Sequence, residues 1–156
     1  MARFLTVEDF TAAVGLDELT QIAGIGNLNR PEGRSLDLPK IEEAISYSED
    51  LLIGYARSRY PVIETLTPEA TPNLVKGLIS DLTRYRLRSR SGGQGQVSAE
   101  VQKRHDDALA NLKSVATGKF ELPIGGEAPN GEAGASKVSS IIPPSPVPSI
   151  LAGWRT

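Results

Sequence analysis

Four arginines at alternate positions, Arg84, Arg86, Arg88 and Arg90, form the densest cluster of charge in the sequence. At helical spacing Arg84 and Arg88 share one face, and Arg86 and Arg90 share another. Such a run is typical of a solvated helix end, where cations also favour the C-terminal end of the helix dipole. Guanidinium groups also bind DNA phosphates or an acidic protein surface. Both interpretations stay open, although no motif for reading base edges accompanies the run.

The single histidine, His105, is followed directly by Asp106. A metal site or a catalytic triad needs further ligands or partners, and adjacent helical side chains point in different directions, so Asp106 is not automatically a partner of the imidazole. The favoured interpretation is a buried or half-buried structural histidine. An enzyme that uses His105 and Asp106 for acid–base chemistry is the weaker alternative. No cofactor and no metal ion are expected.

The segment Gly92-Gly93-Gln94-Gly95 invites comparison with a phosphate-binding loop. A P-loop follows a buried strand and ends in Gly-Lys-Ser or Gly-Lys-Thr, whereas a helical pattern precedes these glycines. We therefore expect a hinge between two helices here.

The composition restricts the classes of function. The chain has 156 residues and a formal net charge of -2, so no global field points to nucleic acid or to an anionic membrane. It has no cysteine, which excludes disulfides and thiolate chemistry. No apolar run is as long as a membrane span, and the first residues do not resemble a signal peptide. We expect no membrane contact and a protein made in a reducing compartment.

Capping residues, prolines and glycines divide the chain into predicted helices. The predicted helices cover residues 7–14, 16–23, 37–60, 71–90 and 98–118. Apolar positions recur at spacings of three and four in the last three of them. The sequence therefore predicts an all-α fold: a small bundle of three long amphipathic helices, with one or two short N-terminal helices and an extended C-terminal arm.

The helical stripes predict the core. The predicted core positions are Phe10, Leu19, Ile22, Ile41, Ala44, Ile45, Ser48, Leu52, Tyr55, Ala56, Leu74, Val75, Leu78, Ile79, Leu82, Tyr85, Val101, His105, Ala108, Leu109, Leu112, Val115 and Ala116. The acids that lie off the stripe of the first long helix are predicted to face water: Glu42, Glu43, Glu49 and Asp50. Residues 24–36 are predicted to form a surface loop and residues 62–70 an extended crossing.

The composition changes beyond Leu122, where proline, glycine, serine and alanine dominate. We therefore divide the chain into a helical domain, residues 1–122, and an arm, residues 123–156, which is expected to become ordered only against a partner. Part of the arm suits an extended or polyproline strand in another chain's groove, with Trp154 as an anchor. The arm residues expected to bind are Ile141, Ile142, Pro143, Pro144, Val147, Ile150, Leu151 and Trp154.

Several segments, in their order and spacing, resemble the Mu-like bacteriophage neck proteins, which are small helical head-completion or head–tail connector proteins. The most specific part is the signature formed by Gly54, Tyr55, Arg59, Tyr60 and Pro61. Weaker similarity is carried by residues 4–10, 81–87, 104–112 and 118–119. The resemblance covers about residues 2–122.

The resemblance implies a structural virion protein and not an enzyme. It implies a homo-oligomeric ring, taken to be a dodecamer, that lies below the portal and joins the capsid to the tail. The implied partners are further copies of the chain, the portal protein and a tail terminator or other neck protein, with non-specific DNA contact in the channel. It implies assembly in the host cytoplasm and a final location at the head–tail junction of the virion.

Within such a ring, the arginine run is predicted to line the DNA channel or to contact the next subunit. The alternative is a small DNA-binding or packaging accessory protein that uses the basic run from Arg84 to Arg90.

Overall fold

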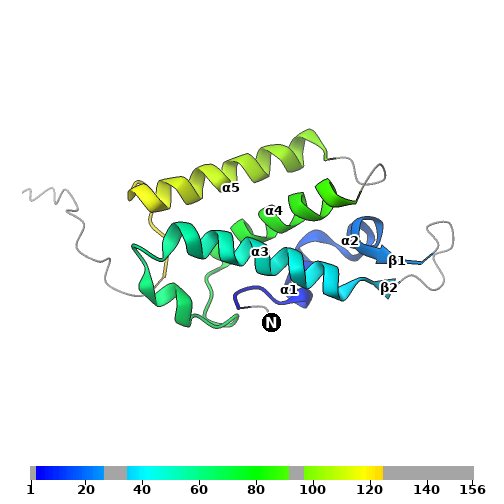
Figure 1. The fold of residues 1–156 in the computed structure, drawn as a ribbon, viewed down its shortest axis with the longest axis horizontal. Coiled ribbons are helices and arrows are strands. Elements are labelled where there is room, and N and C mark those ends of the chain that lie inside the picture. Colours follow the sequence, from blue (N-terminus) through cyan, green and yellow to red (C-terminus); the bar gives the residue numbers. More distant parts are fainter. Residues whose placement is uncertain (1–2, 27–34, 92–96, 125–156) are drawn as a thin grey trace, which may run out of the picture.

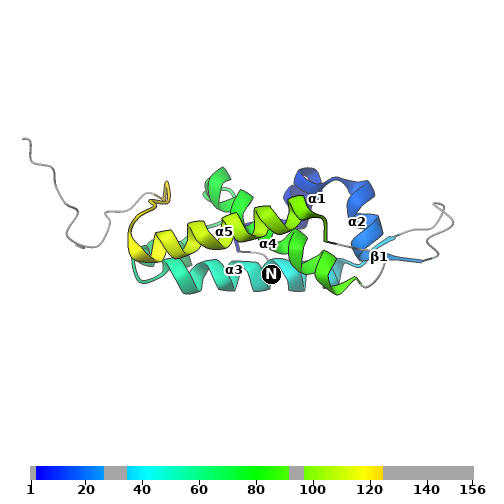
Figure 2. The same ribbon diagram turned by 90° about the horizontal axis from the view of Figure 1, so that it is seen from above.

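The computed structural model describes residues 3–26, 35–91 and 97–124, and these form an all-α bundle (Figure 1). Three long helices, α3 (Leu38–Ala56), α4 (Asn73–Arg90) and α5 (Ala99–Thr117), pack against one another. Two short helices, α1 (Val7–Val14) and α2 (Leu16–Ala23), pack against α4. The view from above shows that they cover one end of the bundle (Figure 2). The predicted fold class is therefore confirmed.

The starts of three helices are set by side-chain caps, as predicted. The Thr6 hydroxyl accepts a hydrogen bond from the Asp9 amide at the start of α1, and Ser98 accepts one from the Val101 amide at the start of α5. Asp37 accepts one from the Lys40 amide at the start of α3. These bonds satisfy amides that have no partner within the helix.

The start of α4 differs by one residue from the prediction, which had Thr71 as the cap and Pro72 as the first helical residue. The helix begins at Asn73, directly after Pro72, and has no side-chain cap. The Thr71 hydroxyl, predicted to cap it, donates instead to the Thr67 carbonyl at 2.8 Å. A serine or threonine hydroxyl bonds to a nearby carbonyl as readily as to an amide, which explains the difference.

The predicted loop over residues 24–36 is partly wrong. Two short strands, β1 (Gly24–Ile25) and β2 (Ser35–Leu36), pair in an antiparallel ladder. Gly24 lies opposite Leu36, and Ile25 lies opposite Ser35. The ladder places the start of α3 beside the end of α2, and the Asp37 amide extends this contact by donating to the Ala23 carbonyl at 2.8 Å.

The first long helix ends earlier than predicted, at Ala56 and not at Tyr60. The amides of Arg59 and Tyr60 both donate to the Ala56 carbonyl, which closes a tight turn. A residue before proline is excluded from helical geometry, and Tyr60 has φ -126° and ψ 74°. The predicted extended crossing also begins differently, because Pro61–Thr65 forms a 3₁₀ helix, η1.

The predicted core is confirmed at most positions and wrong at a few. Leu74, 42% exposed, and Ala116, also exposed, are the positions at which it is wrong. Tyr55, Tyr85, His105 and Leu109 are half-buried, and Tyr55 and Leu109 pack against the core. Thr83 and Leu87 are buried although they lie outside the predicted stripe. The Thr83 hydroxyl donates to the Ser48 hydroxyl at 3.0 Å, so this buried polar pair is satisfied between α4 and α3.

Glu49 was predicted to face water, and this prediction is wrong. Its side chain is buried and accepts hydrogen bonds from the backbone amides of Arg3, Phe4 and Leu5, the shortest at 2.7 Å. The carboxylate thus satisfies three amides that precede α1. Glu49 fixes the N-terminal segment against the middle of α3.

Candidate functional site

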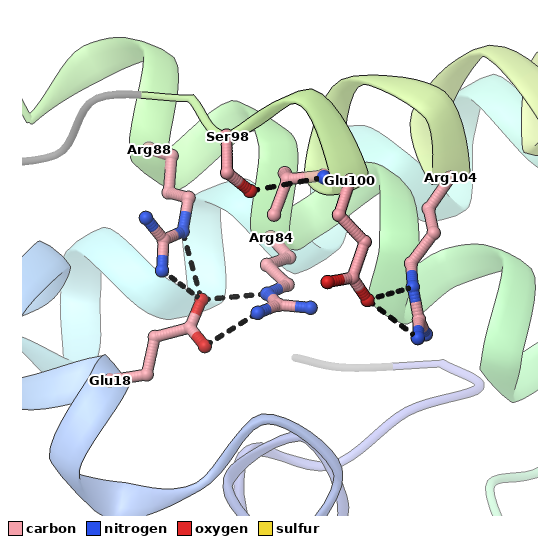
Figure 3. Close-up of polar contacts among 7 residues, drawn as sticks. Glu18, Arg84, Arg88, Ser98, Glu100 and Arg104 are labelled. Carbon is pink, nitrogen blue, oxygen red and sulfur yellow. Dashed lines mark hydrogen bonds and ion pairs between the residues drawn. The ribbon is translucent and has the colours of Figure 1, made fainter.

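The arginine run occupies the last two turns of α4, and its side chains divide between two carboxylates. Arg84 and Arg88 both reach Glu18 of α2 (Figure 3). Arg84 donates through Nε at 2.6 Å and through Nη2 at 2.7 Å, and Arg88 Nη2 lies 2.8 Å from the same carboxylate. The paired geometry is the fork-to-carboxylate arrangement that guanidinium groups favour.

The other face of α4 repeats this pattern towards α3. Arg86 and Arg90 both lie 2.7 Å from the Glu43 carboxylate. The Arg86 guanidinium also lies 3.6 Å above the centre of the Tyr47 ring, which is a cation–π contact. The division of the four arginines into two faces was predicted, but their partners were not.

The pKa values of Glu18 and Glu43 are both lowered, although Glu18 is the more buried of the two. Burial of Glu18 opposes its ionisation, but the hydrogen bonds from Arg84 and Arg88 outweigh burial and hold its pKa below the ordinary value. The pKa of Glu43, which is more exposed, is lowered chiefly by its hydrogen bond from Arg86. Four arginines thus pair with two carboxylates, and Arg84 also interacts with the charges of Glu100 and Asp81. The run is thus a clamp that joins α4 to α2 and α3.

Replacing Glu18 by glutamine is expected to destabilise the protein by about 1–2 kcal/mol at pH 7, because two partly buried arginines lose their anionic partner. The folded-state pKa of Glu18 is lowered, so its contribution is present above the ordinary value of 4.5 and is lost as the pH falls through the lower folded value. The difference between the two proteins in urea denaturation should shrink below about pH 4.5. A smaller loss is expected for Glu43→Gln, and a loss for Glu18→Gln that does not change with pH would contradict the clamp.

A cavity of about 430 Å³ lies beside this clamp, between α1, α4 and the start of α5. It contains Asp81, whose pKa is raised by burial. The three cations that line it each have a carboxylate partner: Lys76 with Asp9, Arg84 with Glu18, and Arg104 with Glu100. Because these charges are already paired, the cavity offers no free cation among the described residues to bind a phosphate.

His105 lies on α5 with its side chain 18% exposed, as expected for a half-buried structural histidine. Its ring stacks on Tyr85, with the ring centres 3.8 Å apart and the planes 21° apart. Its Nδ1 lies 3.1 Å from Asp106 Oδ1, so the adjacent aspartate is a partner after all. The hydrogen bond from Gln102 and this contact lower the pKa of Asp106. Within the described ranges, no group of three or more potential ligands could hold a metal ion.

The family signature joins the end of α3 to the end of α5. Tyr60 is buried, and its hydroxyl accepts a hydrogen bond from the Leu122 amide at 3.2 Å. Arg59 donates to the Val115 carbonyl at 3.4 Å and lies against Gly118. Gly118 has φ +81°, and a side chain there would collide with the Arg59 guanidinium. The signature therefore fixes the place at which the chain leaves the bundle.

The other signature residues differ from one another in their surroundings. Pro61 begins η1 and ends the preceding turn. Tyr55 is half-buried, and Gly54 is exposed, with nothing within 4 Å of where a Cβ would lie. Among the described residues, then, none requires a glycine at position 54.

Two groups of predicted residues cannot be placed. The glycine-rich segment from Gly92 to Gly95 lies outside the described residues. The same holds for every predicted arm residue, from Ile141 to Trp154. In the parts of the chain that are described, no helix is long and apolar enough to cross a membrane.

Sequence reasoning missed a groove on the side of the bundle where α3, α4 and α5 meet. Aromatic side chains from all three helices line it: Tyr47 and Tyr55, Tyr85, and His105. The signal was present in the sequence, because Tyr47, Leu51 and Tyr55 recur every four residues, as do His105 and Leu109. These positions had been assigned to the core or left unassigned. We call this feature the aromatic groove.

Comparison with known protein families shows to which family the chain belongs. Residues 4–140 match the family described as Bacteriophage Mu, Gp36. The chain belongs to this family. No curated protein and no solved structure gives a significant match.

Membership of the Bacteriophage Mu Gp36 family agrees with the resemblance to Mu-like phage proteins. The family description names no enzymatic activity. The match begins at Phe4, whose amide is bound by Glu49, and it includes the arginine clamp and the whole signature. It ends at residue 140, directly before the proline-rich part of the arm.

Proposed function

We propose that this protein is a head-completion, or neck, subunit of a tailed phage or phage-like particle. It forms a homo-oligomeric ring below the portal and joins the capsid to the tail. The observation that carries the proposal is the match of residues 4–140 to a phage protein family, in a sequence whose signature resembles that of neck proteins. The portal and a tail terminator or other neck protein are the proposed partners, and the virion is the proposed location.

The distribution of exposed apolar side chains supports a ring. Ile25 and Leu38, close to the β1–β2 ladder, are 53% and 50% exposed. Val62, on η1 beyond the other end of α3, is 40% exposed. Figure 1 places these elements at opposite ends of the long axis of α3. A ring with head-to-tail contacts needs two different patches on each subunit, and the two ends supply them.

The arginine run has a double role in this proposal. Its carboxylate partners hold α2, α3 and α4 together, and its guanidinium groups contact a neighbouring subunit or DNA in the channel when the ring assembles. DNA phosphates would have to compete with Glu18 and Glu43, which favours a weak, non-specific contact over a packaging accessory that binds DNA tightly. Duplex DNA shifted by the isolated protein in a strongly salt-dependent way would favour the accessory role.

The proposal is tested with particles made in the absence of this protein. We expect DNA-filled heads that carry a portal but no tail, and we expect purified protein to restore tail joining when added to such heads. Heads that join tails equally well without the protein would contradict the proposal.

Gly54→Ala separates folding from assembly. Alanine is expected to stabilise the isolated subunit by about 0.5–1 kcal/mol, because it lowers the entropy cost of the helix. It is also expected to weaken ring formation, since a signature glycine with an open surface suits close approach by a neighbour. The measurements are thermal unfolding and sedimentation velocity.

Gly77→Ala is the matched control for this variant. Gly77 lies in α4, outside the signature, and a Cβ there would likewise meet nothing within 4 Å. We expect a similar gain in stability with no effect on assembly. Equal assembly of both variants would show that Gly54 does not lie in the contact between subunits.

A further inference from the structure

The aromatic groove is a built feature of the bundle with a volume of about 350 Å³. Leucines from the three long helices lie between its aromatic side chains: Leu51, Leu82 and Leu109. Tyr47, on its rim, is 49% exposed. The stacking of Tyr85 on His105 and the cation–π contact of Arg86 on Tyr47 hold several of these rings in place. The groove is thus a largely preformed surface.

The groove presents aromatic rings and tyrosine hydroxyl groups to a ligand. No described residue exchanges a hydrogen bond with the hydroxyl of Tyr47, Tyr55 or Tyr85. A tyrosine presents an apolar ring and a polar tip, so it suits a ligand that is apolar and also offers carbonyl oxygens. Among the described residues that line the groove, Arg86 is the one cation, and its Nη2 is paired with Glu43 while its buried Nε has no hydrogen-bond partner. The groove therefore fits an uncharged ligand better than a charged one.

The chain itself contains a segment of this chemistry. Residues 141–151 have four prolines, five aliphatic residues, two serines and no charge. Proline-rich segments favour the polyproline II helix, which leaves every backbone carbonyl free to accept a hydrogen bond. Aromatic-lined grooves are a recurring receptor for such helices. We infer that residues 141–151 bind in the aromatic groove of their own subunit.

The number of residues between the end of the described chain and residue 141 is sufficient for the segment to reach the groove of its own subunit. The described chain ends at Ile124, close to the end of α5, because Tyr60 holds Leu122 there. His105 lies thirteen residues before Gly118, which is about 20 Å along the helix axis. Sixteen residues separate Ile124 from Ile141, and a random coil of that length has an end-to-end distance of roughly 20–24 Å. A linker whose length matches the span gives the highest effective concentration.

The sequence alone predicted that the arm binds in the groove of another chain. The structure supplies a receptor of matching chemistry within reach on the same chain, which is why we place the arm there. The inference does not depend on the ring, because it concerns a single subunit. It also concerns a segment beyond residue 140, where the family match ends.

The composition of the chain allows the distance between the arm and the groove to be tested with site-specific probes. It has one histidine, which lies in the groove, and no cysteine. A cysteine introduced by Ala152→Cys, just beyond the proposed binding segment, can carry a nitroxide spin label in the full-length protein. Paramagnetic broadening of the His105 ring signals in NMR spectra then reports how close the arm lies to the groove.

We expect strong broadening of the His105 signals, and recovery of their intensity by roughly threefold when Val147→Asp or Tyr47→Ala is added. Val147→Asp places a charge in the apolar segment without changing any residue of the bundle. Leu74→Ala, which removes a comparably exposed apolar side chain elsewhere, should leave the broadening unchanged. Broadening that is equal in all four proteins would overturn the inference.

A mixing experiment distinguishes the subunit's own arm from that of a second copy. Isotope-labelled protein without the spin label is refolded together with unlabelled protein that carries it. We expect no broadening of His105 in this mixture. Broadening in the mixture would overturn the inference in favour of arms exchanged between copies, whether or not the protein forms a ring.

Discussion

Replacing Glu49 by alanine is expected to lower the free energy of unfolding by about 3–5 kcal/mol. Glu49 is 2% exposed and accepts hydrogen bonds from the amides of Arg3, Phe4 and Leu5. Alanine would leave these amides without their acceptor, and two of the three bonds are fully buried. Each unpaired buried amide costs about 1–3 kcal/mol.

Urea denaturation followed by circular dichroism measures this loss. Glu42→Ala is the matched control, since Glu42 lies on the same helix but is exposed, and a change within about 0.5 kcal/mol is expected there. Glu49→Gln should be intermediate, because an amide side chain keeps one acceptor oxygen. Equal effects of Glu49→Ala and Glu42→Ala would mean that the N-terminal segment does not depend on this carboxylate.

The second large effect is expected at the centre of the bundle. Leu112→Ala should destabilise the protein by about 2–5 kcal/mol, because a cavity remains where the side chain was. Leu112 is fully buried on α5, and Leu52, fully buried on α3, should behave alike. Thermal unfolding of these variants measures the effect.

The control for the core variants is Leu16→Ala, which removes the same atoms from a side chain that is 57% exposed. A small change is expected there. If Leu112→Ala cost no more than Leu16→Ala, the three long helices would not share the described core.

The elements that could be predicted from the sequence depend on local interactions. Thr6, Asp37 and Ser98 each bind an amide three residues ahead, and Gly118 adopts the left-handed conformation that ends α5. Such interactions involve neighbours in the sequence, so residue types and spacing suffice to find them. The apolar residues at spacings of three and four predicted most of the core positions for the same reason.

The features that could not be predicted depend on residues far apart in the chain. The charge of Glu49 favours a water-facing position, although its spacing from Ile45 and Leu52 places it on the buried stripe. Its partners lie more than forty residues away. The partner of Arg84 is likewise Glu18, 66 residues away. A single sequence does not reveal which distant polar group neutralises a buried charge.

The residues of the family signature have different roles in the structure. Arg59, Tyr60 and Pro61 were recognised as a group, and in the structure they join the ends of α3 and α5 and fix the exit of the chain at Leu122. Their function in the subunit is therefore structural. Gly54, in contrast, contacts no described residue through the space a Cβ would fill, which is why its variant is informative about assembly.

The mass of the assembled protein, alone and with purified portal complex, tests the central proposal most directly. Native mass spectrometry or analytical ultracentrifugation of the full-length chain is suitable. We expect a closed ring of identical subunits, formed by the protein alone or on addition of portal, and a defined complex of that ring with the portal. A protein that stays monomeric at all concentrations and does not bind the portal would contradict the proposed function.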